Sequence, residues 1–183
     1  LELLPVDAAN KSVEAVKNQQ VDIAFFAIDP LRAADTEFTA AYVTIEGTYV
    51  VPQNSPIQRN EEVDRNGIRI AVAAKSAYDL FLTRSIKNAT LVRTVTSGGV
   101  TDMFLEQKLE VSAGVKQQLE LDMQRLPGLR MLPGRFMEIN QAMGMTKGKP
   151  AAIAYLRSFV EEMKASGFVA DALKRHGVEG VSV

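Results

Sequence analysis

The chain has 183 residues, of which 46% are hydrophobic and 23% charged, and its formal net charge is −1. This length suits one ordinary domain or two small lobes, and the balanced charge gives no general electrostatic case for binding nucleic acid or an anionic membrane. The absence of cysteine excludes a disulfide scaffold, a cysteine nucleophile and thiolate metal sites. The single histidine, His176, lies in a KRHG helix end, so we expect no catalytic triad, metal site or cofactor.

The first quarter of the chain alternates between apolar runs and amphipathic segments. LELLPV at 1–6 is typical of a strand, and residues 10–20 are typical of a helix. Residues 21–28 predict a strand, whose part from 23 to 28 is expected to be buried on both faces. Asp29 and Pro30 then predict the start of a helix, with Asp29 at the N-cap. Such a junction of strand and helix is where α/β proteins often receive ligands.

The rest of the chain continues the alternation of strands and helices. Ser76 and Asp79 form a capping-box-like pair before one of the helices, and Gly167 is the expected end of the longest one. The expected strands cover 44–51, 68–74, 90–94, 109–115, a short piece within 126–135, and 136–145; the expected helices cover 77–87, 100–108, 116–124, 150–166 and 168–176.

An internal echo suggests that two similar units make up the chain. Residues 2–22 align with residues 90–110 at a constant displacement of 88 (90 − 2 and 110 − 22), with matching apolar positions. Both copies are expected to form a strand, a helix, a tight turn and a second strand, which is a βαβ unit. Two such units predict two α/β lobes, with ligands at the carboxyl ends of the strands.

The stretch VDIAFFAIDPLRAADTEFTAAYVTIEGTYVVPQNSPI, residues 21–57, resembles the signature region of bacterial extracellular solute-binding proteins of family 3. These are the polar-amino-acid type of binding protein that serves ABC importers. Downstream, IRIAVAAKSAYDLFL, NQAMGMTKGKP and AYLRSFVEEMKASGFVADALKRHG are similar to the second-lobe strand and helix, the return crossing and the C-terminal helices of that family. The resemblance extends over nearly the whole chain.

The resemblance implies a two-lobed α/β protein with the type 2 periplasmic-binding fold. Lobe one would comprise residues 1–43 plus 138–183, and lobe two residues 44–137, with the ligand in a cleft between the lobes. Family members usually begin with a further strand and helix, so the N-terminal part of lobe one is expected to be missing here. An open sheet edge and exposed apolar surface would then favour self-association.

In lobe one, the resemblance assigns Arg32 to the family arginine that grips the ligand carboxylate, which suits its planar fork of donors. The alternative for Arg32 is a surface ion pair with Asp35 or Glu37. Asp29 stands where relatives have a hydroxyl, and it either caps the helix or accepts from a ligand ammonium. The short turn Phe26, Ala27 and Ile28 replaces a longer polar one, so its backbone is expected to contact ligand.

In lobe two, the resemblance places Lys75, Ser76, Ala77 and Tyr78 at a carboxylate site on a helix N-terminus. A plain capping box is the structural alternative, and the two are compatible. Lys75 replaces the glycine of relatives, which adds charge and removes backbone freedom. Lys116 stands where amino-acid binders commonly have an aspartate, so an inward Lys116 would indicate a more anionic ligand.

The resulting hypothesis is a periplasmic solute-binding component of an ABC importer that binds a small polar, carboxylate-bearing ligand and docks on a membrane permease. No signal peptide is visible in the sequence, so the periplasmic location comes from the resemblance. One alternative is an enzyme on the same fold, a cyclohexadienyl or prephenate-type dehydratase, for which Asp29 or Glu46 would be the acid or base. The other is the ligand-sensing domain of a membrane receptor.

Overall fold

The computed structural model describes all residues from 1 to 183, and they form two compact units. Unit 1 comprises Leu1–Ile45 and Ile139–Val183, and unit 2 comprises Glu46–Glu138. Two long strands, β3 (Val43–Pro52) and β8 (Met137–Thr146), each carry the chain from one unit into the other. None of the helices has both the length and the apolar character that a membrane span requires.

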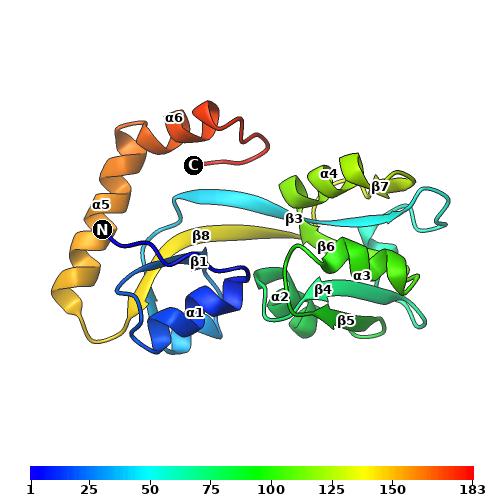
Figure 1. The fold of residues 1–183 in the computed structure, drawn as a ribbon, viewed down its shortest axis with the longest axis horizontal. Helices are drawn as coiled ribbons and strands as arrows, with labels where there is room; N and C mark the ends of the chain where they lie inside the picture. Colours follow the sequence, from blue (N-terminus) through cyan, green and yellow to red (C-terminus); the bar gives the residue numbers. More distant parts are fainter. The chain divides into compact units, whose positions relative to one another are not determined.

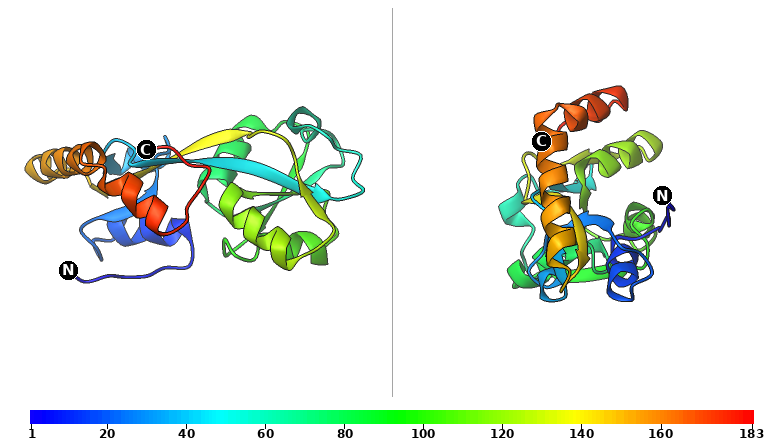
Figure 2. Two further views of the ribbon diagram at one scale, coloured as in Figure 1. Left: turned by 90° about the horizontal axis from the view of Figure 1, so that it is seen from above. Right: turned by 90° about the vertical axis from the view of Figure 1, so that its left-hand side faces the viewer.

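Unit 1 is built on the β8 segment that lies within it. Strands β1 and β2 both pair antiparallel with β8, and α1 packs on β1 (Figure 1). The two C-terminal helices contact each other and meet at an angle (Figure 2). The elements of unit 1 beside β8 and the start of β3 are α1 (Ala9–Lys17), β1 (Ala24–Ala27), the 3₁₀ helix η1 (Arg32–Ala34), β2 (Thr36–Phe38), α5 (Pro150–Ala165) and α6 (Phe168–Arg175).

The longest helix follows the expected pattern. Its side chains Ile153, Leu156 and Val160 are buried along one face, as their spacing of three and four residues predicts. Pro150 occupies the first turn, where its missing N–H costs no hydrogen bond. Gly167 follows the helix with φ +80°, a left-handed conformation that glycine adopts without steric cost.

The N-terminal segment differs from expectation, because residues 1–6 form no strand. Their apolar side chains are exposed, and no strand pairs with their backbone, so the segment has no neighbour with which to form a sheet. β1 is also shorter than predicted and is not buried on both faces, since Phe25 is 56% exposed while Phe26 is buried. The βαβ unit predicted for residues 2–22 is therefore wrong, because its first strand does not form.

Unit 2 contains the second βαβ-like segment, and here the prediction holds. β4 pairs in parallel with both β5 and β6, while β6 and β7 pair antiparallel with β3. α3 connects β5 to β6 and packs on β4 and β6 (Figure 1). The elements of unit 2 beside the β3 and β8 segments are η2 (Asn60–Glu62), β4 (Arg69–Ala73), α2 (Ala77–Ser85), β5 (Thr90–Thr94), α3 (Val100–Glu106), β6 (Val111–Val115), α4 (Lys116–Arg125) and β7 (Leu129–Met131).

Three backbone N–H groups of the turn between α2 and β5 donate hydrogen bonds to one carboxylate, that of Asp64. Asp64 accepts N–H donors from Lys87, Asn88 and Ala89, at 2.7 to 3.1 Å. The N–H of Ala89, with those of Asn88 and Lys87 adding to it, lowers the pKa of Asp64 below its ordinary value of 3.8. The ionised carboxylate therefore stabilises the folded state.

We expect the Asp64→Asn variant to be less stable than the wild type, by an amount that depends on pH. A carboxyl whose pKa is lowered by folding contributes its full stabilisation above the unfolded pKa of 3.8, and loses it as pH falls through the lower folded pKa. The difference in the free energy of unfolding between variant and wild type should thus be constant from about pH 5 to about pH 7. It should shrink in more acidic solution, where the carboxylate of the wild type becomes protonated. Urea unfolding at several pH values measures it. Asp22→Asn, at an exposed carboxylate, is the control; a difference that does not change with pH would contradict the assignment.

Candidate functional site

Arg32 is held inside unit 1 rather than on its surface. The residue is only 6% exposed, and its Nη1 donates to the carbonyl of Ala27 at 2.8 Å. Its guanidinium carbon lies 5.8 Å from the centre of the Phe26 ring, within reach of a cation–π interaction. Burial lowers the pKa of Arg32, and the nearby charge of Asp29 opposes that shift. Arginine keeps its proton in proteins, so a buried cation sits at the end of β1.

The alternative role of Arg32, a surface ion pair, is wrong. Asp35, one of the two carboxylates considered for it, instead pairs with Lys17 at 3.0 Å. A buried guanidinium is costly unless anionic or carbonyl groups surround it, so its position requires such partners. Arg32 is therefore a buried cation, and its contact with a ligand carboxylate stays a prediction.

Asp29 is buried and hydrogen-bonds to the backbone that follows it, while its contact with a ligand ammonium stays a prediction. It is 3% exposed, and its Oδ1 accepts the N–H of Leu31 at 2.8 Å. The backbone carbonyl of Asp29 accepts the N–H of Ala33 at 2.9 Å, but the N-cap of the helical turn that follows is Leu31, which has no side-chain cap. Asp29 instead forms an Asx turn ahead of it, so its predicted N-cap position is wrong. The helical turn is only the short η1, whereas the sequence suggested a full helix. β2 begins at Thr36 and leaves no room for more turns.

The ring of Phe26 lies next to the guanidinium of Arg32 and packs closely against a glycine on the neighbouring strand. Gly144 pairs with Ala24 across the β1–β8 ladder, and a Cβ there would lie 2.6 Å from Phe26 Cζ. Glycine is thus required for the close approach of the ring to β8. Phe26 also makes an edge-to-face contact with Phe38, at 5.4 Å between centroids. Of the predicted turn residues, Phe26 and Ala27 are buried and Ile28 is exposed.

The four predicted residues of unit 2 lie together at the start of α2. Ser76 is the N-cap, and its Oγ accepts the N–H of Asp79 at 3.1 Å. Ala77 and Tyr78 are buried in the first turn, and burial raises the pKa of the Tyr78 hydroxyl. Lys75 has φ +58°, a left-handed conformation that glycine adopts without steric cost, so the lysine adopts it despite its smaller backbone freedom. The predicted cap by Ser76 is confirmed, but the reciprocal bond of a full capping box is not, because Asp79 accepts the N–H of Lys75 instead of that of Ser76.

Lys116 begins α4 and belongs to an ion-pair network. Its Nζ contacts Glu46 Oε2 at 3.1 Å, and Arg135 Nη1 contacts Glu46 Oε1 at 3.1 Å. Arg135 also pairs with Glu138. The hydrogen bond from Lys116, with Arg135 adding to it, holds the pKa of Glu46 below its ordinary value. The expectation that Lys116 either points at ligand or decorates a helix end missed this partner, which is far away in the sequence.

The sequence matches the family described as bacterial extracellular solute-binding proteins, family 3, over residues 2–179. The chain belongs to this family. A comparison with curated protein sequences finds no match.

Solved structures similar to this family member are binding proteins of ABC transporters and related folds. A putative binding component from Wolinella succinogenes DSM 1740, complexed with lysine, is 16% identical with a TM-score of 0.81, and the match covers 96% of this chain and 77% of that one. The solute receptor for L-cysteine of Neisseria gonorrhoeae is 22% identical with a TM-score of 0.81, covering 94% and 70%. An ancestral amino-acid-binding protein, a precursor of cyclohexadienyl dehydratase, is 13% identical with a TM-score of 0.79, covering 95% and 76%. These similarities establish the α/β type 2 periplasmic-binding fold.

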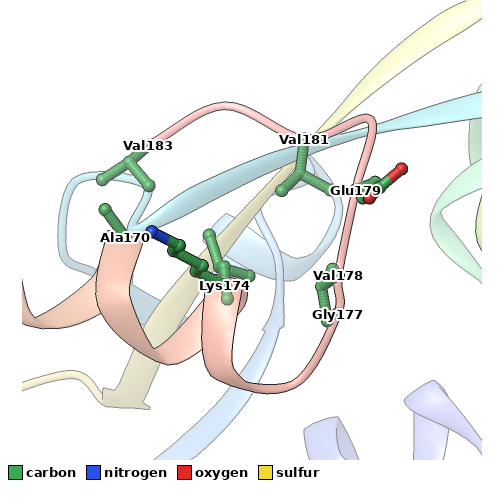
Figure 3. A pocket seen from close by; sticks show the side chains of 8 residues that line it. Ala170, Lys174, Gly177, Val178, Glu179, Val181 and Val183 are labelled. Carbon is green, nitrogen blue, oxygen red and sulfur yellow. The ribbon is translucent and has the colours of Figure 1, made fainter.

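Two hollows in unit 1 of the solute-binding chain lie apart from these residues. One, of about 500 Å³, has a mainly apolar lining to which β1, β3, β8, α5 and α6 contribute, and it includes the exposed Phe25 and Phe168. The other, of about 360 Å³, lies between α6 and the C-terminal segment that folds back over it (Figure 3). Ser182 in that segment pairs with Thr44 at the start of β3. Neither hollow contains any of the predicted ligand-binding residues.

The sequence did not reveal the groups that fix the predicted residues in place. Arg93 on β5 pairs with Asp79, and Arg135 pairs with Glu46 across 89 positions of sequence. An arginine in a strand gives no local signal of which carboxylate it will meet. Only the cap at Ser76 and Asp79 had such a signal, because its partners are three residues apart.

Proposed function

We propose that this chain is the periplasmic solute-binding component of an ABC importer and that it binds a small, carboxylate-bearing ligand such as an amino acid or a related organic anion. The chain's family consists of bacterial extracellular solute-binding proteins, which supports the role of a binding protein. The two compact units would be the two lobes, and a membrane permease would be the protein partner. Self-association through the exposed apolar residues of unit 1 stays a prediction.

The observation that carries the proposal is the buried Arg32. A guanidinium that is desolvated and backed by an aromatic ring binds a carboxylate through two parallel, charge-assisted hydrogen bonds. The start of α2, with Ser76 and the first-turn N–H groups, would be the second anion-binding group. Lys116 would contribute positive charge only in part, because Glu46 already neutralises it.

The dehydratase alternative has one observation in its favour and one against it. The ancestral binding protein among the structural neighbours is a precursor of such an enzyme. However, a general acid needs a pKa near the working pH, and the pKa of Glu46 is shifted the opposite way. One carboxylate oxygen of Asp29 accepts the N–H of Leu31. Both carboxylates thus fit structural roles better than proton transfer.

Titration calorimetry tests the proposal with a panel of L-lysine, L-cysteine, L-glutamate and succinate. The wild-type chain is expected to bind at least one carboxylate-bearing member, without converting it, and mass spectrometry of the mixture checks that the ligand is unchanged. Turnover of prephenate that is lost in Asp29→Ala would instead support the dehydratase.

A further inference from the structure

The turn before α2 has an unusual backbone for the residue that occupies it. Lys75 adopts φ +58°, a backbone conformation that is sterically unfavourable for residues with a Cβ and common for glycine. Such a conformation persists only where neighbouring groups hold it. Here the N–H of Lys75 donates to Asp79 Oδ2 at 2.8 Å. The carboxylate therefore acts on the backbone of the turn directly.

Asp79 is the centre of a closed network. It is 4% exposed, and it accepts from Arg93 Nε at 3.0 Å and from Thr83 Oγ1 at 3.3 Å, in addition to the N–H of Lys75. Arg93 Nη2 also donates to Thr83 Oγ1 at 2.9 Å. Because β5 carries Arg93 and α2 carries Asp79 and Thr83, the network joins the helix to the sheet. A buried carboxylate with this many donors has little freedom to move.

The network also determines the charge at this helix end. A lone aspartate in the first turn would repel an anion that approaches the N-terminus of α2. Arg93 neutralises Asp79 at a distance of 2.9 Å, so the aspartate adds little negative charge at this helix end. The N–H of Asp79 is bonded to Ser76 Oγ, so the N–H groups of Ala77 and Tyr78 are the donors that remain in the first turn.

We propose that Asp79 and Arg93 are positioning residues for ligand binding, which hold Lys75 in its left-handed conformation and so aim the first-turn donors of α2. Neither residue needs to touch the ligand. The inference rests on the proposed function, in which this helix end binds an anionic group. It predicts that Asp79 matters because residue 75 is not glycine.

A double-mutant cycle on ligand affinity tests this dependence. The tightest-binding member of the calorimetric panel is titrated into the wild type, Asp79→Asn, Lys75→Gly and the double variant. Asp79→Asn should weaken binding about tenfold in the wild-type background, the usual effect of a lost hydrogen bond to a charged group. In the Lys75→Gly background it should weaken binding less than about twofold, because glycine adopts the left-handed conformation unaided.

A matched control comes from the same unit. Asp102→Asn removes a carboxylate that also pairs with an arginine, Arg125 at 2.9 Å, but on α3 and away from the turn; its affinity should equal that of the wild type. If Asp79→Asn does not fold, Arg93→Lys replaces it in the cycle, with the same expected pattern. Equal weakening in both backgrounds, or none in either, would overturn the positioning role. A wild type that binds no panel member would overturn the proposed function itself.

Discussion

Arg32→Ala is expected to weaken ligand binding at least tenfold, since it removes charge-assisted hydrogen bonds of the kind that contribute about 1.5–3 kcal/mol each. The guanidinium is buried, so water does not replace the lost donors as it would at the surface. Arg32→Lys retains the charge and should still bind more weakly than the wild type, because an ammonium cannot offer the planar fork. Calorimetry with the same panel measures both variants.

Arg157→Ala is the matched control for this prediction. Arg157 belongs to the same unit and also donates to a backbone carbonyl, that of Phe38 at 3.1 Å, but it is exposed on α5. Its removal should leave the affinity unchanged. Circular dichroism verifies that each variant is folded. A folded Arg32→Ala that binds as tightly as the wild type would refute the assignment of Arg32 as the carboxylate grip.

Phe104→Ala should destabilise unit 2 by about 3–5 kcal/mol, the range measured when a buried phenylalanine is truncated in a close-packed core. Phe104 is fully buried on α3, the helix that packs against β4 and β6. The strands on which it packs carry Ile70 and Val111, which are also fully buried. Urea unfolding followed by circular dichroism gives the free energy of unfolding.

The neighbouring residue provides the comparison for Phe104. Leu105 lies on the same helix but is 39% exposed, so Leu105→Ala should cost less than about 1 kcal/mol, as is usual for surface positions. The two variants differ by one position in sequence and by the face of the helix. Similar losses of stability in both would mean that α3 does not bury the face assigned to it.

Much of the fold was predictable because its signals are local. The strand predicted for 90–94 and the helix expected from Pro150 onward follow directly from apolar periodicity and end signals. The left-handed Gly167 was likewise predictable, since a glycine after an amphipathic helix is its usual end. The helix also buries Ile153, Leu156 and Val160 along one face, so its local propensity and its tertiary packing agree.

The failures arose where a strand needs a partner from elsewhere. LELLPV has the composition of a strand, yet residues 1–6 pair with nothing and remain exposed. Strand propensity reflects the fit to a sheet surface rather than an intrinsic backbone preference, so composition alone did not decide. The same holds for β1, where Phe25 is exposed although the run from Ile23 to Ile28 is almost continuously apolar.

The candidate site was predictable in its residues but not in their partners. The resemblance placed Arg32 and Ser76, and the structure gives the first a buried position and the second an N-cap role. The pairing of Lys116 with Glu46 and of Asp79 with Arg93 depends on which strands lie next to which helices. Such pairs are set by topology, and a single sequence carries no direct record of it.

The most direct test of the account is calorimetric titration of the wild-type chain with L-lysine, L-cysteine, L-glutamate and succinate, alongside native mass spectrometry of the purified protein for a co-purified ligand. The account predicts saturable binding of a carboxylate-bearing member, or a co-purified small molecule that carries a carboxylate. A co-purified neutral sugar or metal ion, with no heat from any member of the panel, would contradict it.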